Sequence, residues 1–164
     1  MAHLEPMKIS GGSSEETVVL REYGAGDWER MHALDVECFE PEFRFSRRVM
    51  RGFAEDPGAM TVLAEARGDL VGFCVVQMEG QVGYVVTLDV AAAWRRRGLA
   101  RRMMEEVEAK ARAAGGAGMA LHVFAGNAGA MRFYEGIGYG RAGRVEGFYG
   151  RGLDALVYRK RFEG

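Results

Sequence analysis

The residues best suited to bind a charged ligand form one basic stretch in the second half of the chain. It reads Trp94-Arg95-Arg96-Arg97-Gly98-Leu99-Ala100-Arg101-Arg102. Residues 82–90, just before it, are rich in β-branched side chains and have the length of one strand. Residues 99–114 repeat apolar side chains at helical spacing and end before a Gly-Gly pair. The pattern predicts a strand that leads through a basic turn into a helix.

The first turn of that helix has the chemistry of a phosphate site. The first backbone N–H groups of a helix have no partner within it, and the helix dipole adds partial positive charge there. Gly98 and Ala100 leave room for a phosphate to approach this backbone. A cation at a helix start opposes the dipole by about 0.3–1 kcal/mol, so clustered arginines are unfavourable there unless an anion binds. We therefore expect a pyrophosphate site. The alternatives are a solvated helix start that binds nothing and a Rossmann dinucleotide site, although the G-x-G-x-x-G fingerprint is absent.

Seven strands and four helices are expected along the chain. The expected strands occupy residues 17–23, 60–66, 70–78, 82–90, 118–124, 139–145 and 153–161, and the expected helices 26–38, 46–55, 98–114 and 127–137. Short turns between the three runs from 60 to 90 predict an antiparallel meander, and the continuous apolar run at 118–124 is typical of a buried parallel strand. The fold class is therefore α/β (α+β), one domain over residues 17–164 with a mixed central sheet of about seven strands and helices on both faces. Residues 1–16 are polar and aperiodic, and we expect them to form a flexible leader.

Composition limits the class of partner. The net charge is −1, so nothing global favours nucleic acid or an anionic membrane. No apolar run approaches the roughly 18 residues of a membrane span and no signal peptide is visible, which makes a cytoplasmic protein the default expectation. Cys38 and Cys74 lie far apart without metal-ligand spacing, so no metal is expected. Exposed sheet edges often pair in such an architecture, so a homodimer stays open.

Two motifs in this order resemble the GCN5-related N-acetyltransferase (GNAT) family, most closely its ribosomal-protein alanine N-acetyltransferase branch. The acyl-CoA signature of the family, Gln/Arg-x-x-Gly-x-Gly/Ala, is matched by residues 95–100 (RRRGLA). Residues 127–139 (NAGAMRFYEGIGY) are similar to the asparagine-to-tyrosine helix of the family and its following Gly-aromatic pair. The resemblance covers residues 17–161. It implies a GNAT-type domain that uses acetyl-CoA as cosubstrate and transfers the acetyl group directly to a primary amine.

The resemblance also assigns residues to the coenzyme. The cofactor-binding residues that it implies are Leu88, Asp89, Val90, Arg95, Arg96, Arg97, Gly98, Leu99, Ala100, Arg101, Asn127 and Tyr134. In the family, the strand at residues 82–90 splays from the next one and offers backbone groups to the pantetheine amides and the thioester carbonyl. Backbone N–H groups from residues 96–101 would take the pyrophosphate. Asn127 also has an alternative role as a helix cap.

Tyr134 and His122 are the candidate catalytic residues. By resemblance, Tyr134 protonates the departing thiolate, whereas its spacing alone favours a core aromatic residue. His122 stands where the closest branch has a glutamate that acts through water as general base. An imidazole with a pKa near 6.5 suits a base at neutral pH, and a packed neutral histidine is the alternative.

The acceptor is expected to be a protein N-terminal α-amine. Its ordinary pKa is about 7.7–8.0 against about 10.4 for lysine, so an enzyme with a weak base is better matched to it. Two segments, residues 39–46 and 146–154, are expected to border the acceptor. Two other readings stay open: a small-molecule amine such as an antibiotic, polyamine or amino acid, and a catalytically weak acyl-CoA-binding sensor.

Overall fold

The computed structural model describes residues 7–11 and 14–163. Its strands are β1 (Met7–Gly11), β2 (Ser14–Glu22), β3 (Ala59–Ala66), β4 (Asp69–Glu79), β5 (Val82–Val90), β6 (Gly118–Phe124), β7 (Gly140–Val145) and β8 (Ala155–Arg161). Its α-helices are α1 (Asp27–Cys38), α2 (Arg47–Ala54), α3 (Leu99–Ala113) and α4 (Ala128–Gly136). Single-turn 3₁₀ helices lie at Pro41–Phe43 and Ala92–Trp94. The seven predicted strands and four predicted helices are all present, with ends that differ by up to three residues.

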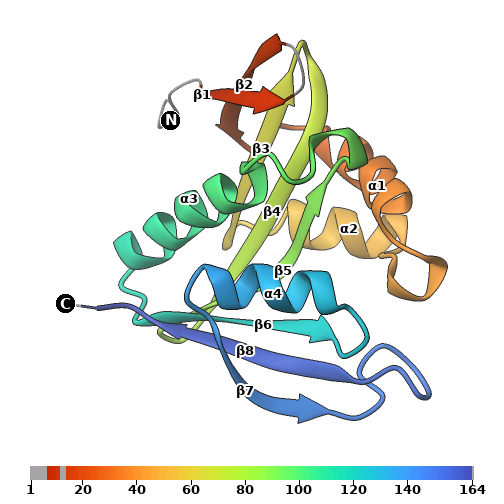
Figure 1. The fold of residues 1–164 in the computed structure, drawn as a ribbon, viewed down its shortest axis with the longest axis vertical. Helices are drawn as coiled ribbons and strands as arrows, with labels where there is room; N and C mark the ends of the chain where they lie inside the picture. The colour runs from red at the N-terminus through yellow and green to blue at the C-terminus, as the bar shows by residue number, and fades with distance from the viewer. Residues whose placement is uncertain (1–6, 12–13, 164) are drawn as a thin grey trace.

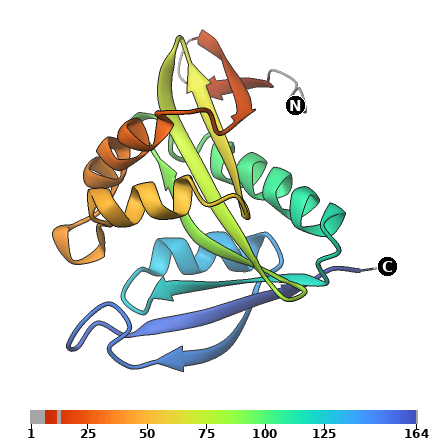
Figure 2. The same ribbon diagram turned by 180° about the vertical axis from the view of Figure 1, so that it is seen from behind.

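One mixed sheet joins the eight strands in the order β1-β2-β3-β4-β5-β6-β8-β7 (Figure 1). The strands from β1 to β5 pair antiparallel, β5 and β6 pair parallel through the α3 crossover, and β8 lies antiparallel between β6 and β7. Helices α1 and α2 cover one face of the sheet, while α3 and α4 cover the other (Figures 1 and 2). Each face has its own apolar core, which confirms the predicted α/β domain with helices on both faces.

The N-terminal region differs from the predicted leader. Residues 1–6 and 12–13 lie outside the described residues, but residues 7–11 and 14–16 belong to strands. Met7–Gly11 pairs antiparallel with residues 14–18, in register from Met7 with Val18 to Gly11 with Ser14. A backbone ladder of this kind needs no apolar alternation, because its hydrogen bonds join main-chain groups. Polarity and lack of period therefore gave no sign of this eighth strand.

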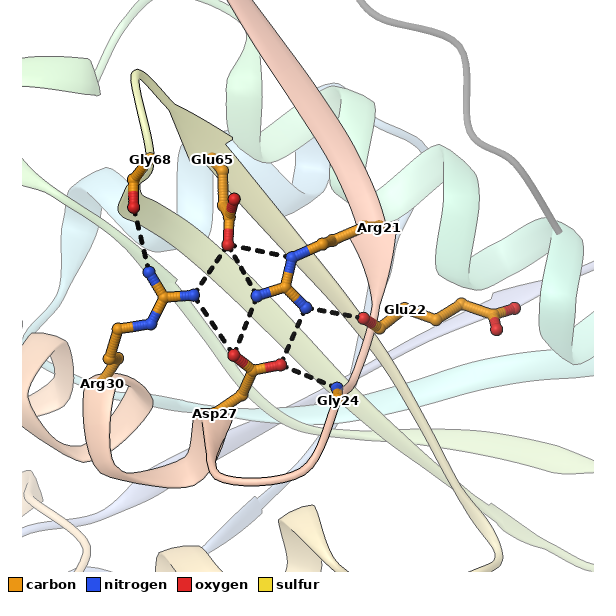
Figure 3. A network of polar contacts seen from close by, with 7 residues as sticks. All are labelled: Arg21, Glu22, Gly24, Asp27, Arg30, Glu65 and Gly68. Atoms are coloured by element: carbon orange, nitrogen blue, oxygen red, sulfur yellow. Dashed lines mark hydrogen bonds and ion pairs between the residues drawn. The ribbon is translucent and has the colours of Figure 1, made fainter. Parts of the chain in front are cut away.

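A network of charged side chains fixes the start of α1 to the sheet (Figure 3). The Asp27 carboxylate accepts two hydrogen bonds of 2.8 Å from Arg21 on β2 and one of 2.7 Å from the Gly24 N–H. Arg21 and Arg30 also donate to Glu65 on β3, at 2.6 and 2.7 Å. The bonds from Arg21 lower the pKa of Asp27 to about 2. This carboxylate therefore stays ionised and holds α1 against β2 and β3.

Candidate active site

The site is built around a gap between the parallel strands β5 and β6. Their register covers only three residue pairs, from Val82 with Gly118 to Tyr84 with Ala120. Beyond Tyr84, the rest of β5 has no register partner on β6, although it remains paired with β4 as far as Val90. The edge of β5 that faces β6 is therefore unpaired over the last six of its nine residues.

Backbone groups of β5 point into this gap. The N–H of Ala91 donates to the carbonyl of Val71 at the β4 side, at 2.8 Å. Because neighbouring residues of a strand direct their peptide groups to opposite edges, Val90 and Leu88 direct theirs away from β4 and into the gap. The structure thus places the two predicted backbone positions on one open strand edge.

The carbonyl of Val90 already has partners. It accepts hydrogen bonds from the Cys38 thiol at 3.3 Å and from Arg95 Nε at 3.1 Å. A carbonyl oxygen has two lone pairs, so this acceptor is fully used. The N–H of Val90 and the peptide groups of Leu88 are what this edge offers to a ligand.

The predicted turn into α3 has a left-handed backbone. Gly98 is the residue before the helix, with φ of 84°, and Arg96 has φ of 60°. The N–H of Arg102 donates to the Gly98 carbonyl at 3.0 Å, which begins the helical hydrogen bonds. The N–H groups of residues 99–101 precede that bond and point out of the helix start. Since the buried Leu99 side chain fixes the turn to the core, these donors are held in an arrangement that would suit an anion.

The arginines of the turn have two kinds of environment. Arg95 donates to the backbone at the end of β5, and the Arg97 guanidinium lies 4.9 Å from the ring centroid of Trp94. Arg96 is exposed, and Arg101 is exposed beside Glu105 at 3.6 Å. Arg95 and Arg97 therefore shape the turn, while Arg96 and Arg101 add accessible positive charge around it.

Asp89 lies between Leu88 and Val90 but its side chain belongs to the α1 face. It is 1% exposed and interacts with Asp35 of α1. Its register partner is Phe73, which lies in the core beneath α1 and α2. Leu88, Asp89 and Val90 were all predicted to bind the coenzyme, but the charged side chain of Asp89 faces away from the gap.

Helix α4 contributes Asn127 and Tyr134. The Asn127 side chain accepts a hydrogen bond of 3.0 Å from the Ala130 N–H and so caps the helix. Tyr134 is 9% exposed and packs 5.7 Å from the Tyr139 ring. Burial raises the pKa of Tyr134, and smaller electrostatic contributions come from groups that include Tyr149 and Asp89. Tyr134 is therefore a core aromatic residue with a phenol that keeps its proton at neutral pH.

His122 forms a pair that the sequence did not reveal. Its Nδ1 shares a hydrogen bond of 2.7 Å with the Tyr84 hydroxyl, and its ring stacks on Phe148 at 4.1 Å. Tyr84 is the last β5 residue in register with β6, so the pair lies where the two strands separate. Burial lowers the pKa of His122, so the imidazole is neutral at pH 7. A tyrosine in a run of aliphatic residues was the only sequence signal for this partner.

Aromatic side chains from three segments form a rim beside this pair. Phe43, between α1 and α2, lies 4.9 Å from the ring centroid of Phe124 at the end of β6. It also lies 5.2 Å from Tyr149, which in turn contacts Phe148 at 4.9 Å. The two segments predicted to border an acceptor, residues 39–46 and 146–154, therefore meet at the end of β6.

Among the described residues, no group of three or more His, Cys, Asp or Glu side chains is placed to hold a metal ion. None of the helices described is both long enough and apolar enough to cross a membrane.

The chain belongs to the acetyltransferase (GNAT) family, whose model matches residues 28–139, and it is an N-acetyltransferase. Similar solved structures include the ribosomal-protein-S18-alanine N-acetyltransferase from Escherichia coli, with 19% identity, a TM-score of 0.79, and 90% of this chain and 96% of that one covered. Arabidopsis thaliana NAA60 in complex with a bisubstrate analogue has 22% identity, a TM-score of 0.79, and coverage of 90% and 99%. A nourseothricin acetyltransferase has 28% identity, a TM-score of 0.73, and coverage of 88% and 98%. The family predicted from the two motifs is confirmed.

Proposed function

We propose that this protein transfers the acetyl group of acetyl-CoA to the α-amine of a protein N-terminus. The observation on which this rests is the Tyr84–His122 pair at the opening of the β5–β6 gap. An imidazole with a lowered pKa is a weak base. About a tenth of α-amines are already neutral at pH 7, whereas neutral lysine is rarer by about 2.5 pKa units. A weak base is therefore matched to an α-amine.

The open edge of β5 and the start of α3 fit the two polar parts of acetyl-CoA. The Val90 N–H and the Leu88 peptide groups suit the amides of an extended pantetheine arm. The N–H groups of residues 99–101 suit a pyrophosphate, and Arg96 and Arg101 add positive charge nearby. Acetyl-CoA would supply an activated acyl group with a thiolate as the leaving group. This arrangement supports the predicted coenzyme site, except that the Asp89 side chain takes no part in it.

Two side chains would then handle protons. His122 would accept the proton of the attacking amine, directly or through a water molecule. In the tautomer with its proton on Nδ1, the Nε2 atom has a free lone pair for this purpose. Tyr134 would give its proton to the departing thiolate. Holding the amine against the thioester would supply much of the remaining acceleration.

A small-molecule amine is the second candidate acceptor. The similarity to a nourseothricin acetyltransferase favours it, since that relative has the highest identity of the three structures described above. The aromatic rings beside the gap would suit a flat or cationic small molecule as well as a peptide.

Acetyl-CoA turnover with matched acceptors tests the proposal. One peptide has a free N-terminus and no lysine, and its twin has a blocked N-terminus and one lysine. A panel of aminoglycoside, streptothricin-type and polyamine amines completes the set. We expect thiol release with the first peptide and an N-terminal acetyl group in its mass spectrum. Turnover restricted to small amines would establish the second candidate instead, and turnover restricted to the lysine peptide would contradict both.

A further inference from the structure

Two buried carboxyl groups meet where α1 packs on the end of β5. Asp35 of α1 is 0% exposed and Asp89 of β5 is 1% exposed. One oxygen of each has a donor, since the Phe45 N–H donates to Asp35 Oδ2 at 2.9 Å and the Thr87 hydroxyl donates to Asp89 Oδ1. The remaining oxygens, Asp35 Oδ1 and Asp89 Oδ2, have no hydrogen-bond donor among the described residues. The two carboxyl groups lie close enough to interact electrostatically, so each is a polar neighbour of the other in the core.

A single proton resolves this arrangement. Two ionised carboxylates in a buried site repel each other, and neither can donate a hydrogen bond. One proton between them removes a charge and satisfies both unpartnered oxygens. We propose that Asp35 and Asp89 share one proton and that this pair positions residues 39–46 beside the acceptor. The part that concerns the acceptor rests on the proposed function.

The contacts of Asp35 show what the pair would position. Its carboxylate holds the N–H of Phe45, and His32 Nε2 lies 3.1 Å from the carbonyl of the same residue. Phe43, two residues earlier, makes the rim contacts with Phe124 and Tyr149. Asp89, at the other end, adjoins the residues whose peptide groups face the gap. The pair therefore joins the edge that would hold the thioester to the segment that would hold the amine.

The groups around the pair leave its proton in place at neutral pH. Burial, together with Asp35, raises the pKa of Asp89 well above its usual range, while Thr87 and the Arg95 cation act in the opposite direction. The thiols of Cys38 and Cys74 and the phenol of Tyr134 also interact with Asp89, and burial raises the pKa of each. These three groups are neutral, and His32 faces the Phe45 carbonyl rather than Asp89. The protonated Asp89 would stabilise the folded state fully below the ordinary carboxyl pKa, and this contribution would be lost as pH rises through its raised pKa.

Carboxyl-carbon NMR of ¹³C-aspartate-labelled protein tests the shared proton without any acceptor. We expect one protonated aspartyl carboxyl at neutral pH in the wild type and none in Asp35→Asn or Asp89→Asn, because the introduced amide donates in place of the proton. Asp27→Asn is the control on the same helix and should keep the signal. Absence of a protonated carboxyl in the wild type, or its persistence in both variants of the pair, would overturn the shared proton.

Amide exchange and kinetics test the positioning. Asp89→Ala removes the partner, so we expect exchange of the Phe45 amide to accelerate by about 10-fold or more. Asp89→Asn should keep its protection. The KM for the acceptor should rise in Asp89→Ala while the Kd for acetyl-CoA is retained. Unchanged Phe45 exchange in a folded Asp89→Ala protein would overturn the positioning role. If no amine is acetylated at all, the proposed function fails while the NMR and exchange results still decide on the pair.

Discussion

Removal of the His122 imidazole should separate its chemical role from its packing role. A positioned general base typically contributes about 10²–10⁴-fold, or about 2.7–5.4 kcal/mol of barrier. His122→Ala should therefore lower kcat by that range. Tyr84→Phe keeps the ring and removes only the hydroxyl that bonds Nδ1. A neutral hydrogen bond contributes about 0.5–1.5 kcal/mol, so this variant should lose only about 2–13-fold.

The pH dependence of kcat gives a second measure of the same residue. Because burial lowers the pKa of His122, the base stays unprotonated to below pH 6.5. The loss of wild-type kcat on acidification should therefore occur below pH 6.5, and it should be absent in His122→Ala. Tyr158→Phe is the control, since this buried tyrosine bonds Glu135 rather than the site. Retention of wild-type kcat in His122→Ala at pH 6–7 would refute the role of His122 as base.

Three further changes probe other parts of the structure. Tyr134→Phe should retain the calorimetric Kd for acetyl-CoA and lose about 10²–10⁴-fold in kcat, whereas Tyr139→Phe, its aromatic neighbour, should turn over normally. Asp27 has a pKa of about 2 in the folded protein, so it should stabilise the fold by about 2 kcal/mol above the ordinary carboxyl pKa and lose this as pH falls through 2. Urea unfolding of wild type and Asp27→Asn at pH 7 and pH 2 measures this contribution. An equal difference in the free energy of unfolding between the two proteins at both pH values would contradict the prediction. Gly98→Ala and Gly115→Ala both strain a positive φ, at 84° and 87°, and should each cost about 1–2 kcal/mol in thermal unfolding. Only Gly98→Ala should weaken acetyl-CoA binding, and equal Kd changes in both would argue against the helix start as the pyrophosphate site.

Local patterns were enough to predict most of the fold. The basic turn was predictable because Gly98 separates a β-branched run from a helical period, and both signals act over a few residues. The meander from β3 to β5 was predictable because two-residue turns at 67–68 and 80–81 leave no room for another connection. Strand β1 could not be predicted, because main-chain hydrogen bonds require no particular pattern of side chains.

The pairs at the site could not be predicted, because each depends on register between distant elements. Tyr84 and His122 are 38 residues apart and meet only because β5 and β6 pair over three residues and then separate. Asp89 lies between Leu88 and Val90, whose peptide groups face the gap as predicted. Because side chains alternate between faces along a strand, the Asp89 side chain lies on the opposite face of the sheet from theirs. No local signal told which face Asp89 would take, or that Asp35 would meet it there.

Strand β5 explains how one element would position both reactants. Its hydrogen bonds with β4 fix it along its whole length, so the free edge toward β6 and the side chains on either face are rigid with respect to one another. The edge presents the peptide groups of Leu88 and the N–H of Val90, and the side chain of Tyr84 orients His122 where the edge begins to open. A shift of one residue in the β4–β5 register would reverse every one of these directions, because peptide groups and side chains both alternate with period two. The β-bulge between Val75 and Val76 lies between Tyr84 and Leu88 in that register. It therefore determines how the open edge at Leu88 and Val90 is oriented relative to the Tyr84–His122 pair. In the proposed reaction, the geometry of transfer would therefore depend on this bulge as much as on the side chains that would move the protons.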